Sequence, residues 1–376
     1  MNATGWRFLL RVVAKAAMLF ILCNLVFALL DPVEALGRIS LYNTILPGRE
    51  RLPYGENPAQ SYNLSLYSVP AMFASHEVAR PKSVDEYRVF LLGDSATWGW
   101  FLENADTYAT NINAANLTSA DGRRIVVYNI GYPIEALAKD LMLLDEAMQY
   151  QPDQIIWLVT LQSFPRETQL FPPIVQNNAE RMRALIVRYN LQLDQRDSRF
   201  VEVDFLGKTV VGQRRALADW LRLQLYGFSW AATGIDQFIP AEYTLRRSDF
   251  EEDVSWENYT EETTLNADDL AFDVLAAGVE RAGEVPITII NEPMFTSSGV
   301  NSDLRYNAFY PRWAYDQYRE LMAAQAEENG WNYLDWWDWI APDEFTDSPV
   351  HLTPAGSRQL SDWLGEAIVG ASSTTD

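Results

Sequence analysis

The apolar positions of this 376-residue chain fall into short, nearly continuous runs between residues 88 and 334. Five of these runs have the length of β-strands and are bounded by Gly, Pro, Asn or Asp. They cover residues 88–92, 125–129, 154–161, 285–291 and 331–334. Strands that are buried on both faces read as continuous apolar runs rather than as alternating patterns. The runs therefore predict a parallel sheet that is covered by helices on both sides.

Longer stretches with apolar residues at helical spacing lie between these strands. They cover residues 136–150, 313–329 and 354–368. Because strands and amphipathic helices alternate along the chain, the pattern predicts an α/β protein of three layers, with the sheet in the middle.

One interval interrupts the alternation. About 120 residues separate the third strand from the fourth, far more than a crossover connection needs. Helical patterns occur in it at residues 178–189, 214–226 and 266–282, together with an acidic stretch at 249–269. The interval, residues 165–284, predicts a helical insertion beside the carboxyl edge of the sheet, which could bind a protein partner.

The N-terminus has a different composition. Residues 16–30 carry no charge and one polar side chain, Asn24, and extending the run back to residue 12 gives 19 residues with Lys15 inside. Such a run is long enough to cross a bilayer, because a lysine near its end can extend to the headgroups. Arg7, Arg11 and Lys15 on the N-terminal side predict that this end stays in the cytoplasm.

Three interpretations of this segment compete: an uncleaved anchor, a cleaved signal peptide and a buried helix of a soluble protein. Val33-Glu34-Ala35 offers a small-residue cleavage pattern. Leu22 before Cys23 argues against lipidation. The uncleaved anchor is favoured, and it predicts a single-pass protein of the cell membrane whose domain is extracytoplasmic. The expected organisation is 1–31 stub and anchor, 32–85 stalk and extension, 86–370 main domain, and 371–376 tail.

Composition excludes several functions. With 51 acidic and 29 basic residues the net charge is −22, which repels phosphate backbones and excludes a nucleic-acid partner. The single cysteine, Cys23, excludes a disulfide framework and a cysteine zinc site. With two histidines, His76 and His351, no multi-histidine metal site can form. No Walker loop or dinucleotide fingerprint is present, so neither a metal nor a cofactor is expected.

The strongest candidate chemistry involves a serine and a histidine at opposite ends of the chain. Gly93, Asp94 and Ser95 end the first strand, where ligands and nucleophiles gather in open parallel sheets. His351 stands just before the last helical pattern, with Asp347 four residues earlier. A histidine that deprotonates a serine and is held by an aspartate is the arrangement of serine-nucleophile enzymes.

Two further blocks make a resemblance specific. Residues 129–133 read Asn-Ile-Gly-Tyr-Pro, and Pro152-Asp153 leads into the third strand. In this order, and with Gly93-Asp94-Ser95 and Asp347…His351, the blocks resemble those of the GDSL/SGNH hydrolase family. The resemblance covers residues 86–164 and 285–370, and it implies a flavodoxin-like α/β/α domain.

The resemblance also implies roles. Ser95 would be the nucleophile, His351 the base and Asp347 its orienting carboxylate, with Gly93 and Asp94 forming the turn. Gly131, Ile134 and Gln162 occupy the positions of the oxyanion and binding residues. Three departures are present. Ile134 and Gln162 stand where the family has glycine and asparagine, and the Asp–His spacing is four rather than three, which leaves Asp343 as an alternative carboxylate.

The leading functional hypothesis is an extracytoplasmic serine esterase that acts on O-acetylated glycans or lipid esters. One alternative is an O-acyltransferase of an extracellular polysaccharide, which would use the same chemistry. A second alternative is not an enzyme: a non-catalytic scaffold with an altered oxyanion hole. Tryptophans near the motifs could stack on sugars or serve as packing anchors. Asn291-Glu292-Pro293 resembles a glycosidase acid motif, but no barrel pattern accompanies it, so it is interpreted as a coincidence.

Overall fold

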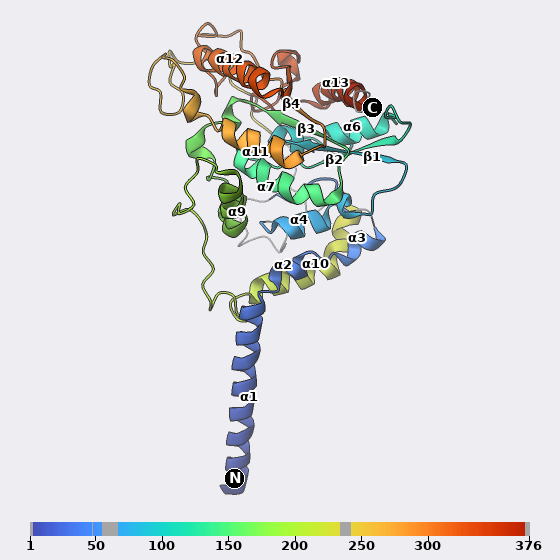
Figure 1. Ribbon diagram of the computed structural model, residues 1–376, viewed down its shortest axis with the longest axis vertical. Helices are drawn as coiled ribbons and strands as arrows, with labels where there is room; N and C mark the ends of the chain where they lie inside the picture. Colours follow the sequence, from blue (N-terminus) through green and yellow to red (C-terminus); the bar gives the residue numbers. More distant parts are fainter. Residues whose placement is uncertain (1–2, 47, 55–66, 234–241, 373–376) are drawn as a thin grey trace.

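The computed structural model describes residues 3–46, 48–54, 67–233 and 242–372. Helix α1, Ala3–Leu30, extends away from the rest of the described chain, here called the head (Figure 1). Its segment Gly5–Leu30, 26 residues, is long and apolar enough to cross a membrane. The expected run of residues 12–30 is thus the C-terminal part of a longer helix.

The head is built on a five-stranded sheet. Its strands are β1 (Glu86–Leu92), β2 (Arg124–Asn129), β3 (Gln154–Val159), β4 (Ile287–Asn291) and β5 (Asn332–Asp335). They pair in the order β2-β1-β3-β4-β5, and every pair is parallel. The predicted parallel sheet is confirmed, and the change of direction in strand order places a crevice at the carboxyl ends of β1 and β3.

Two helical layers cover the sheet. Helices α7 (Leu137–Ala147) and α11 (Phe272–Ala282) pack together on one face, and α6 (Tyr108–Ala114) and α13 (Pro354–Ser372) pack together on the other. Strand β1 alternates between them: Phe90 and Leu92 belong to the core under α7, while Val89 and Leu91 belong to the core under α13. The predicted three-layer α/β/α class is confirmed, with every residue of β1 buried.

Helix α12 (Arg312–Asn329) connects β4 to β5. Tyr315 and Tyr318 on this helix are completely buried, and both hydroxyls donate to Oδ1 of Asn291 at 3.2 and 3.4 Å. The Asn-Glu-Pro tripeptide therefore begins with a residue that fixes α12 to the end of β4.

The segment between α1 and the sheet is part of the head and packs on the side of the sheet that α7 covers. It contains α2 (Val33–Gly37), α3 (Leu41–Ile45) and α4 (Val69–Ser75). Leu52 and Phe73 are completely buried in the core under α7. His76 is also buried, and its Nδ1 accepts from the N–H of Val78 at 3.1 Å, so this histidine is a packing residue.

The interval between β3 and β4 contains several helices. It contains α8 (Pro173–Gln176), α9 (Ala179–Tyr189) and α10 (Arg214–Thr233) before α11. These helices pack against different partners: α11 and α9 against α7, and α10 against α2 and α3. The reason is that each helix carries its own apolar face, and the nearest uncovered surface differs for each.

Candidate active site

The first motif forms a tight turn at the carboxyl end of β1. Ser95 opens the short helix α5 (Ser95–Trp98), and Oδ1 of Asp94 caps that helix by accepting from the N–H of Ala96 at 2.7 Å. A side chain at Gly93 would collide with Thr97, since an added Cβ would lie 2.3 Å from its hydroxyl oxygen. Asp94 and Gly93 therefore shape the turn that presents Ser95.

The structure brings Ser95, His351 and Asp347 together, although 252 residues separate the serine from the aspartate along the chain. Nε2 of His351 lies 2.7 Å from Oγ of Ser95, and its Nδ1 lies 2.7 Å from Oδ1 of Asp347. Both distances are those of strong hydrogen bonds. The arrangement is that of a serine nucleophile, a base and a carboxylate that orients the base.

The spacing of four residues between Asp347 and His351 is accommodated by a turn. Oγ of Ser348 accepts from the N–H groups of Val350 and His351, at 3.3 and 3.2 Å. An antiparallel bridge between Phe345 and Leu352 closes this loop. The extra residue is absorbed inside the turn, and Asp343 does not take the place of Asp347.

The three side chains are each partly accessible. Ser95 is half-buried, the His351 side chain is 10% exposed, and that of Asp347 is 27% exposed. The ring of Trp100 lies nearly parallel to the imidazole, with 6.1 Å between ring centroids, and Phe101 lies edge-on at 6.3 Å. The two aromatic rings therefore border the imidazole.

The second motif supplies one strained backbone position. Gly131 donates its N–H to Oδ1 of Asn129 at 3.0 Å and leaves no room for a side chain, because an added Cβ would lie 2.6 Å from the nitrogen of Trp98. Gly131 is thus a packing residue rather than an oxyanion donor. Ile134 has a φ of 79°, which is a rare conformation for a β-branched residue. Among the described residues, none accepts the N–H of Ile134.

The third motif residue, Gln162, points to a different partner from the one expected. It lies in the short turn Leu161–Ser163 after β3. Its Nε2 donates to Oε1 of Glu257 at 3.0 Å, and its backbone N–H donates to the Tyr310 hydroxyl at 3.2 Å. The expected direction of the amide, toward Ser95, is therefore not the one in the structure. Glu257 belongs to the acidic stretch, 95 residues further along the chain.

A group of buried charges lies behind the serine turn. Nζ of Lys139 donates to the carbonyls of Gly93 and Tyr132 at 2.9 and 2.8 Å, and it pairs with Oδ1 of Asp140 at 2.6 Å. One ammonium group thus connects the nucleophile turn to the loop that carries Ile134. The indole N–H of Trp157 donates to the other carboxylate oxygen of Asp140, Oδ2, at 3.1 Å.

Two further acids in this group are held in their neutral form. Burial, with the charge of Asp94 as the next cause, raises the pKa of Glu292 well above its usual range. The same two causes raise the pKa of Glu135 to about 8. A protonated Glu292 can donate to Asp94, which supports the carboxylate that caps α5.

Two segments outside the sheet hold the site in place. Arg51 of the N-terminal extension is completely buried and donates to the carbonyls of Gly99 and Leu102 at 2.8 and 2.5 Å. From the long interval, the N–H of Arg246 donates to the carbonyl of Thr346 at 3.0 Å, and Tyr243 contacts Phe101 with ring centroids 4.9 Å apart. The nucleophile turn and the histidine loop are thus each supported from outside the sheet.

Sequence reasoning missed Lys139, Glu292 and Arg51 as residues of this region. Lys139 and Glu292 had a signal, because a charge within an otherwise apolar run predicts a buried pair. Arg51 had none. Of the tryptophans near the motifs, Trp98 is buried and donates to the carbonyl of Leu52 at 2.8 Å, so it is a packing residue. The described part of the chain contains no group of three or more His, Cys, Asp or Glu side chains placed to hold a metal.

The fold and the site together define an α/β protein with an SGNH hydrolase-like fold. Its serine, histidine and aspartate meet at the carboxyl edge of a parallel sheet with the order β2-β1-β3-β4-β5. No protein-family model matches the sequence, and the search of curated proteins found no match.

Several solved structures are similar to this chain. A protein assigned to the G-D-S-L family of lipolytic proteins, from Desulfitobacterium hafniense, is 12% identical, with a TM-score of 0.34 over 74% of this chain and 98% of its own. The inhibitor-bound aryl esterase of M. smegmatis is 11% identical, with a TM-score of 0.34 over 75% and 98%. A carbohydrate acetylesterase family member from Sinorhizobium meliloti is 13% identical, with a TM-score of 0.31 over 75% and 99%.

Proposed function

We propose that the head is a serine hydrolase of acyl esters. The observation that carries this proposal is the unbroken chain of hydrogen bonds from Ser95 through His351 to Asp347. Oγ of Ser95 attacks the ester carbonyl carbon while Nε2 of His351 takes its proton, and the carboxylate of Asp347 stabilises the imidazolium that forms. The imidazolium then protonates the departing alcohol. Water, deprotonated by the same nitrogen, releases the acid and restores the serine.

The N–H groups of Ser95 and Ile134 are the proposed oxyanion donors. Neither donates to any residue within the described ranges, and the strained φ of Ile134 is the kind of backbone outlier that accumulates at active sites. Donors of this type each contribute about 3–4 kcal/mol to stabilisation of the transition state. The side chain of Ile134 is partly exposed at the position where the family has glycine.

The substrate class that fits best is an O-acetylated glycan or a lipid ester. Among the similar proteins are an aryl esterase and a carbohydrate acetylesterase family member, each named for its own activity. Transfer of the acyl group to a sugar hydroxyl would use the same first step, with the sugar in place of water. The orientation of Gln162 toward Glu257 is the observation that favours the third hypothesis, a scaffold without activity.

Labelling by a fluorophosphonate tests the activity. The full-length protein should be labelled, Ser95→Ala should not, and Ser83→Ala, which changes an exposed serine outside the site, should be labelled like the wild type. Absence of labelling in the wild type would support the scaffold. Where labelling occurs, analysis of the products separates the remaining two functions: free acid indicates a hydrolase, and an acylated sugar indicates a transferase.

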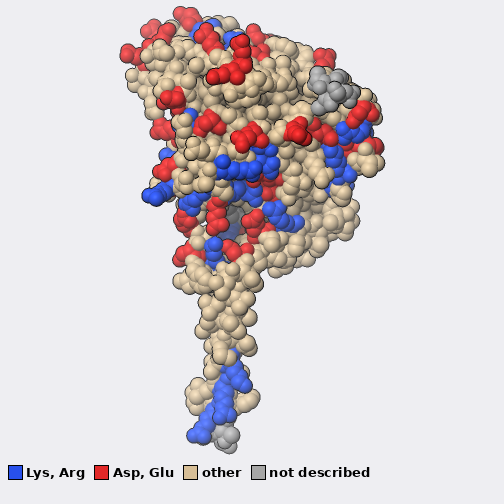
Figure 2. Space-filling model, in the orientation of Figure 1, with Lys and Arg blue, Asp and Glu red and all other residues tan. Residues whose placement is uncertain are grey.

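The proposed location is the cell membrane, with α1 as a single-pass anchor and the head outside the cytoplasm. Arg7, Arg11 and Lys15 lie at the free end of α1, where Figure 2 shows basic side chains beyond a long uncharged stretch. This asymmetry supports a cytoplasmic N-terminus. Protease treatment of spheroplasts should degrade the head, and protection of the head would contradict this topology.

A further inference from the structure

The turn formed by residues 204–213 lies beside the outer end of α1. The N–H of Val211 donates to Oδ1 of Asn24 at 3.2 Å, and Nζ of Lys208 pairs with Asp31 at 2.8 Å. Asn24 precedes Leu30 by six residues, which corresponds to about 9 Å along a helix axis. If α1 spans a membrane as proposed, Val211 lies well inside the outer leaflet.

Several backbone N–H groups of this turn have hydrogen-bond partners within the protein, as an apolar surrounding favours. In lipid, every N–H must find a partner within the protein. The N–H groups with such partners are those of Gly207, Lys208, Thr209, Val211, Gly212 and Gln213. Asn24 is satisfied as well, because its Nδ2 donates to the carbonyl of Phe20 at 2.9 Å.

The turn carries three exposed apolar side chains, those of Phe205, Leu206 and Val211, beside the polar Asp204, Lys208 and Gln213. Leu29 and Leu30, at the end of α1, are exposed as well. An apolar surface that continues directly from a membrane-spanning helix is at the correct height to contact the same lipids.

Helix α10 extends this surface. One side of it packs on α3: Oε1 of Gln224 accepts from the N–H of Leu41 at 2.8 Å, and Gly227 lies directly against Tyr42. The opposite side exposes Leu221, Leu225 and Tyr226. Arg214 and Arg215, at the start of α10, are exposed and follow the turn. In Figure 1, α10 runs obliquely from the end of α1 beneath the head, and Figure 2 shows few charged side chains on the underside of the head to the right of α1.

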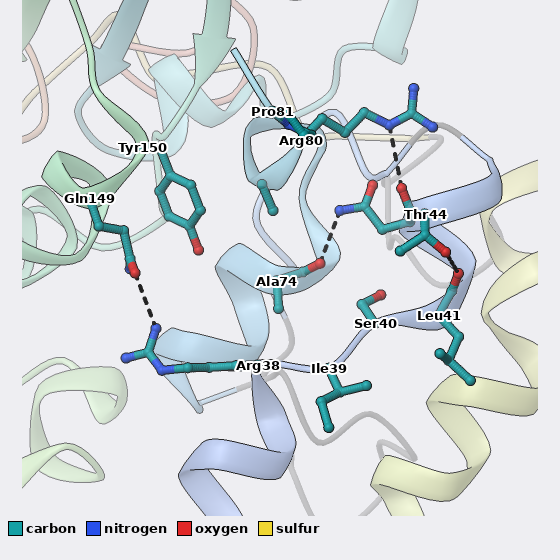
Figure 3. Close-up of a pocket in the computed structure, with 12 residues that line it drawn as sticks. Arg38, Ile39, Ser40, Leu41, Thr44, Ala74, Arg80, Pro81, Gln149 and Tyr150 are labelled. Atoms are coloured by element: carbon teal, nitrogen blue, oxygen red, sulfur yellow. Dashed lines mark hydrogen bonds between the residues drawn. The ribbon is translucent and has the colours of Figure 1, made fainter.

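A cavity of about 1000 Å³ opens above this surface (Figure 3). Ile39 and Leu41 line it together with the cationic side chains of Arg38 and Arg80. Ser40 is buried, and its Oγ has no hydrogen-bond partner in the described part of the chain. A lining with both apolar and cationic side chains suits the acyl chains and phosphate headgroups of a lipid.

We propose that the head rests on the outer leaflet of the membrane through a membrane-facing surface. This surface consists of the turn 204–213, the exposed side of α10 and helix α3, and its occupant is the lipid that surrounds α1. The proposal rests on the spanning of the membrane by α1. It adds that the head is held in one orientation on the lipid, so that the height of Ser95 above the membrane is fixed.

Fluorescence quenching by lipids with brominated acyl chains tests this proposal in the full-length protein, in phosphatidylethanolamine/phosphatidylglycerol nanodiscs. The single native cysteine, Cys23, lies on α1 and carries a bimane probe in the wild type. In a Cys23→Ser background, Val211→Cys and Leu225→Cys place the probe on the membrane-facing surface. Val300→Cys is the matched control, since Leu225 and Val300 are 72% and 60% exposed and Val300 lies in the segment before α12. Figure 1 places α12 at the end of the head away from α1.

We expect the brominated lipids to quench bimane fluorescence at positions 23, 211 and 225. The fluorescence at position 300 should stay unchanged. Quenching at 23 without quenching at 211 and 225 would overturn the membrane-facing surface and leave the anchor intact. No quenching at any position would overturn the anchor itself. Protection of 211 and 225 from a water-soluble maleimide without quenching would show that protein, such as a second copy, covers this surface instead of lipid.

Discussion

At the scale of single residues, the four-residue spacing between Asp347 and His351 makes a direct prediction. The hydrogen bond at 2.7 Å supports the proposal that Asp347 orients the imidazole. We expect Asp347→Asn to lower kcat by roughly 10⁴, because the amide favours the wrong tautomer of the imidazole. Asp343→Asn, which changes the alternative carboxylate, should leave kcat unchanged. Steady-state hydrolysis of an aryl acetate measures both, and equal losses would contradict the assignment.

The strained backbone conformation of Ile134 is predicted to lower the free energy of unfolding. A left-handed conformation costs a β-branched residue about 1–2 kcal/mol, and glycine adopts it without this cost. Since the Ile134 side chain is partly exposed, its removal loses little packing. Ile134→Gly should therefore raise the free energy of unfolding by about 1 kcal/mol, after the added entropy of the unfolded chain is subtracted. Urea unfolding measures this. Val84→Gly, at another exposed position, is the control and should not be stabilising.

Gln162 and Glu257 make a prediction about the oxyanion hole. Their hydrogen bond keeps the amide from acting as a donor at Ser95 in this conformation. If Gln162 becomes a donor once substrate binds, Glu257→Ala should raise kcat and Gln162→Ala should lower it by about 10²–10³-fold, with KM less affected. Glu261→Ala, in the same acidic stretch, is the control. Unchanged kcat in both Gln162→Ala and Glu257→Ala would assign the hole to backbone donors alone.

At the scale of elements, the sequence predicted the strands well because each is an apolar run ended by a turn residue. The start of β5 and the end of β2 differ from the prediction by at most one residue. The end of β3 was placed at Leu161, two residues too far, because Thr160 and Leu161 continue the apolar pattern into the turn. Hydrophobicity does not distinguish a buried turn from a buried strand.

The candidate site was predictable in part, for a similar reason. Ser95 and His351 follow local motifs, and the structure brings them into contact. The partner of Gln162 was not predictable, since Glu257 is distant in sequence and no pattern connects the two. The role of Lys139 depends on the carbonyls of Gly93 and Tyr132, which are backbone groups that no side-chain pattern reveals.

Helix α11 provides the test at this scale. It was expected in the insertion, but Gly278 packs it onto the sheet: an added Cβ would lie 2.2 Å from the ring of Trp157, which is completely buried. Gly278→Ala should lower the free energy of unfolding by about 1–3 kcal/mol through overpacking. Gly370→Ala in α13 meets no atom within 4 Å and should raise it by about 0.5–1 kcal/mol through helix propensity. Thermal unfolding compares the two, and equal effects would contradict the packing assigned to α11.

At the scale of the whole molecule, the site depends on three parts of the chain that are far apart in sequence. Arg51 supports the nucleophile turn from the N-terminal extension, and Arg246 supports the histidine loop from the long interval. The same interval contacts α1 through Lys208 and Val211. The segments outside the sheet therefore connect the site to α1, which a domain made of the sheet and its covering helices alone would not do.

His76 links the packing of the extension to pH. Burial lowers its pKa from 6.5 to about 4, and the folded protein holds the imidazole neutral. As the pH falls below about 6.5 the unfolded chain binds a proton there and the folded chain does not, so unfolding becomes more favourable until the pH approaches 4. The free energy of unfolding should fall across this window by on the order of 3 kcal/mol through His76 alone. In His76→Asn, which keeps an acceptor for the N–H of Val78, this part of the slope should vanish. Urea unfolding at a series of pH values measures both proteins, and carboxylates that titrate below pH 5 contribute equally to each. Parallel curves for the two proteins between pH 5 and 6.5 would show that His76 is not buried in its neutral form.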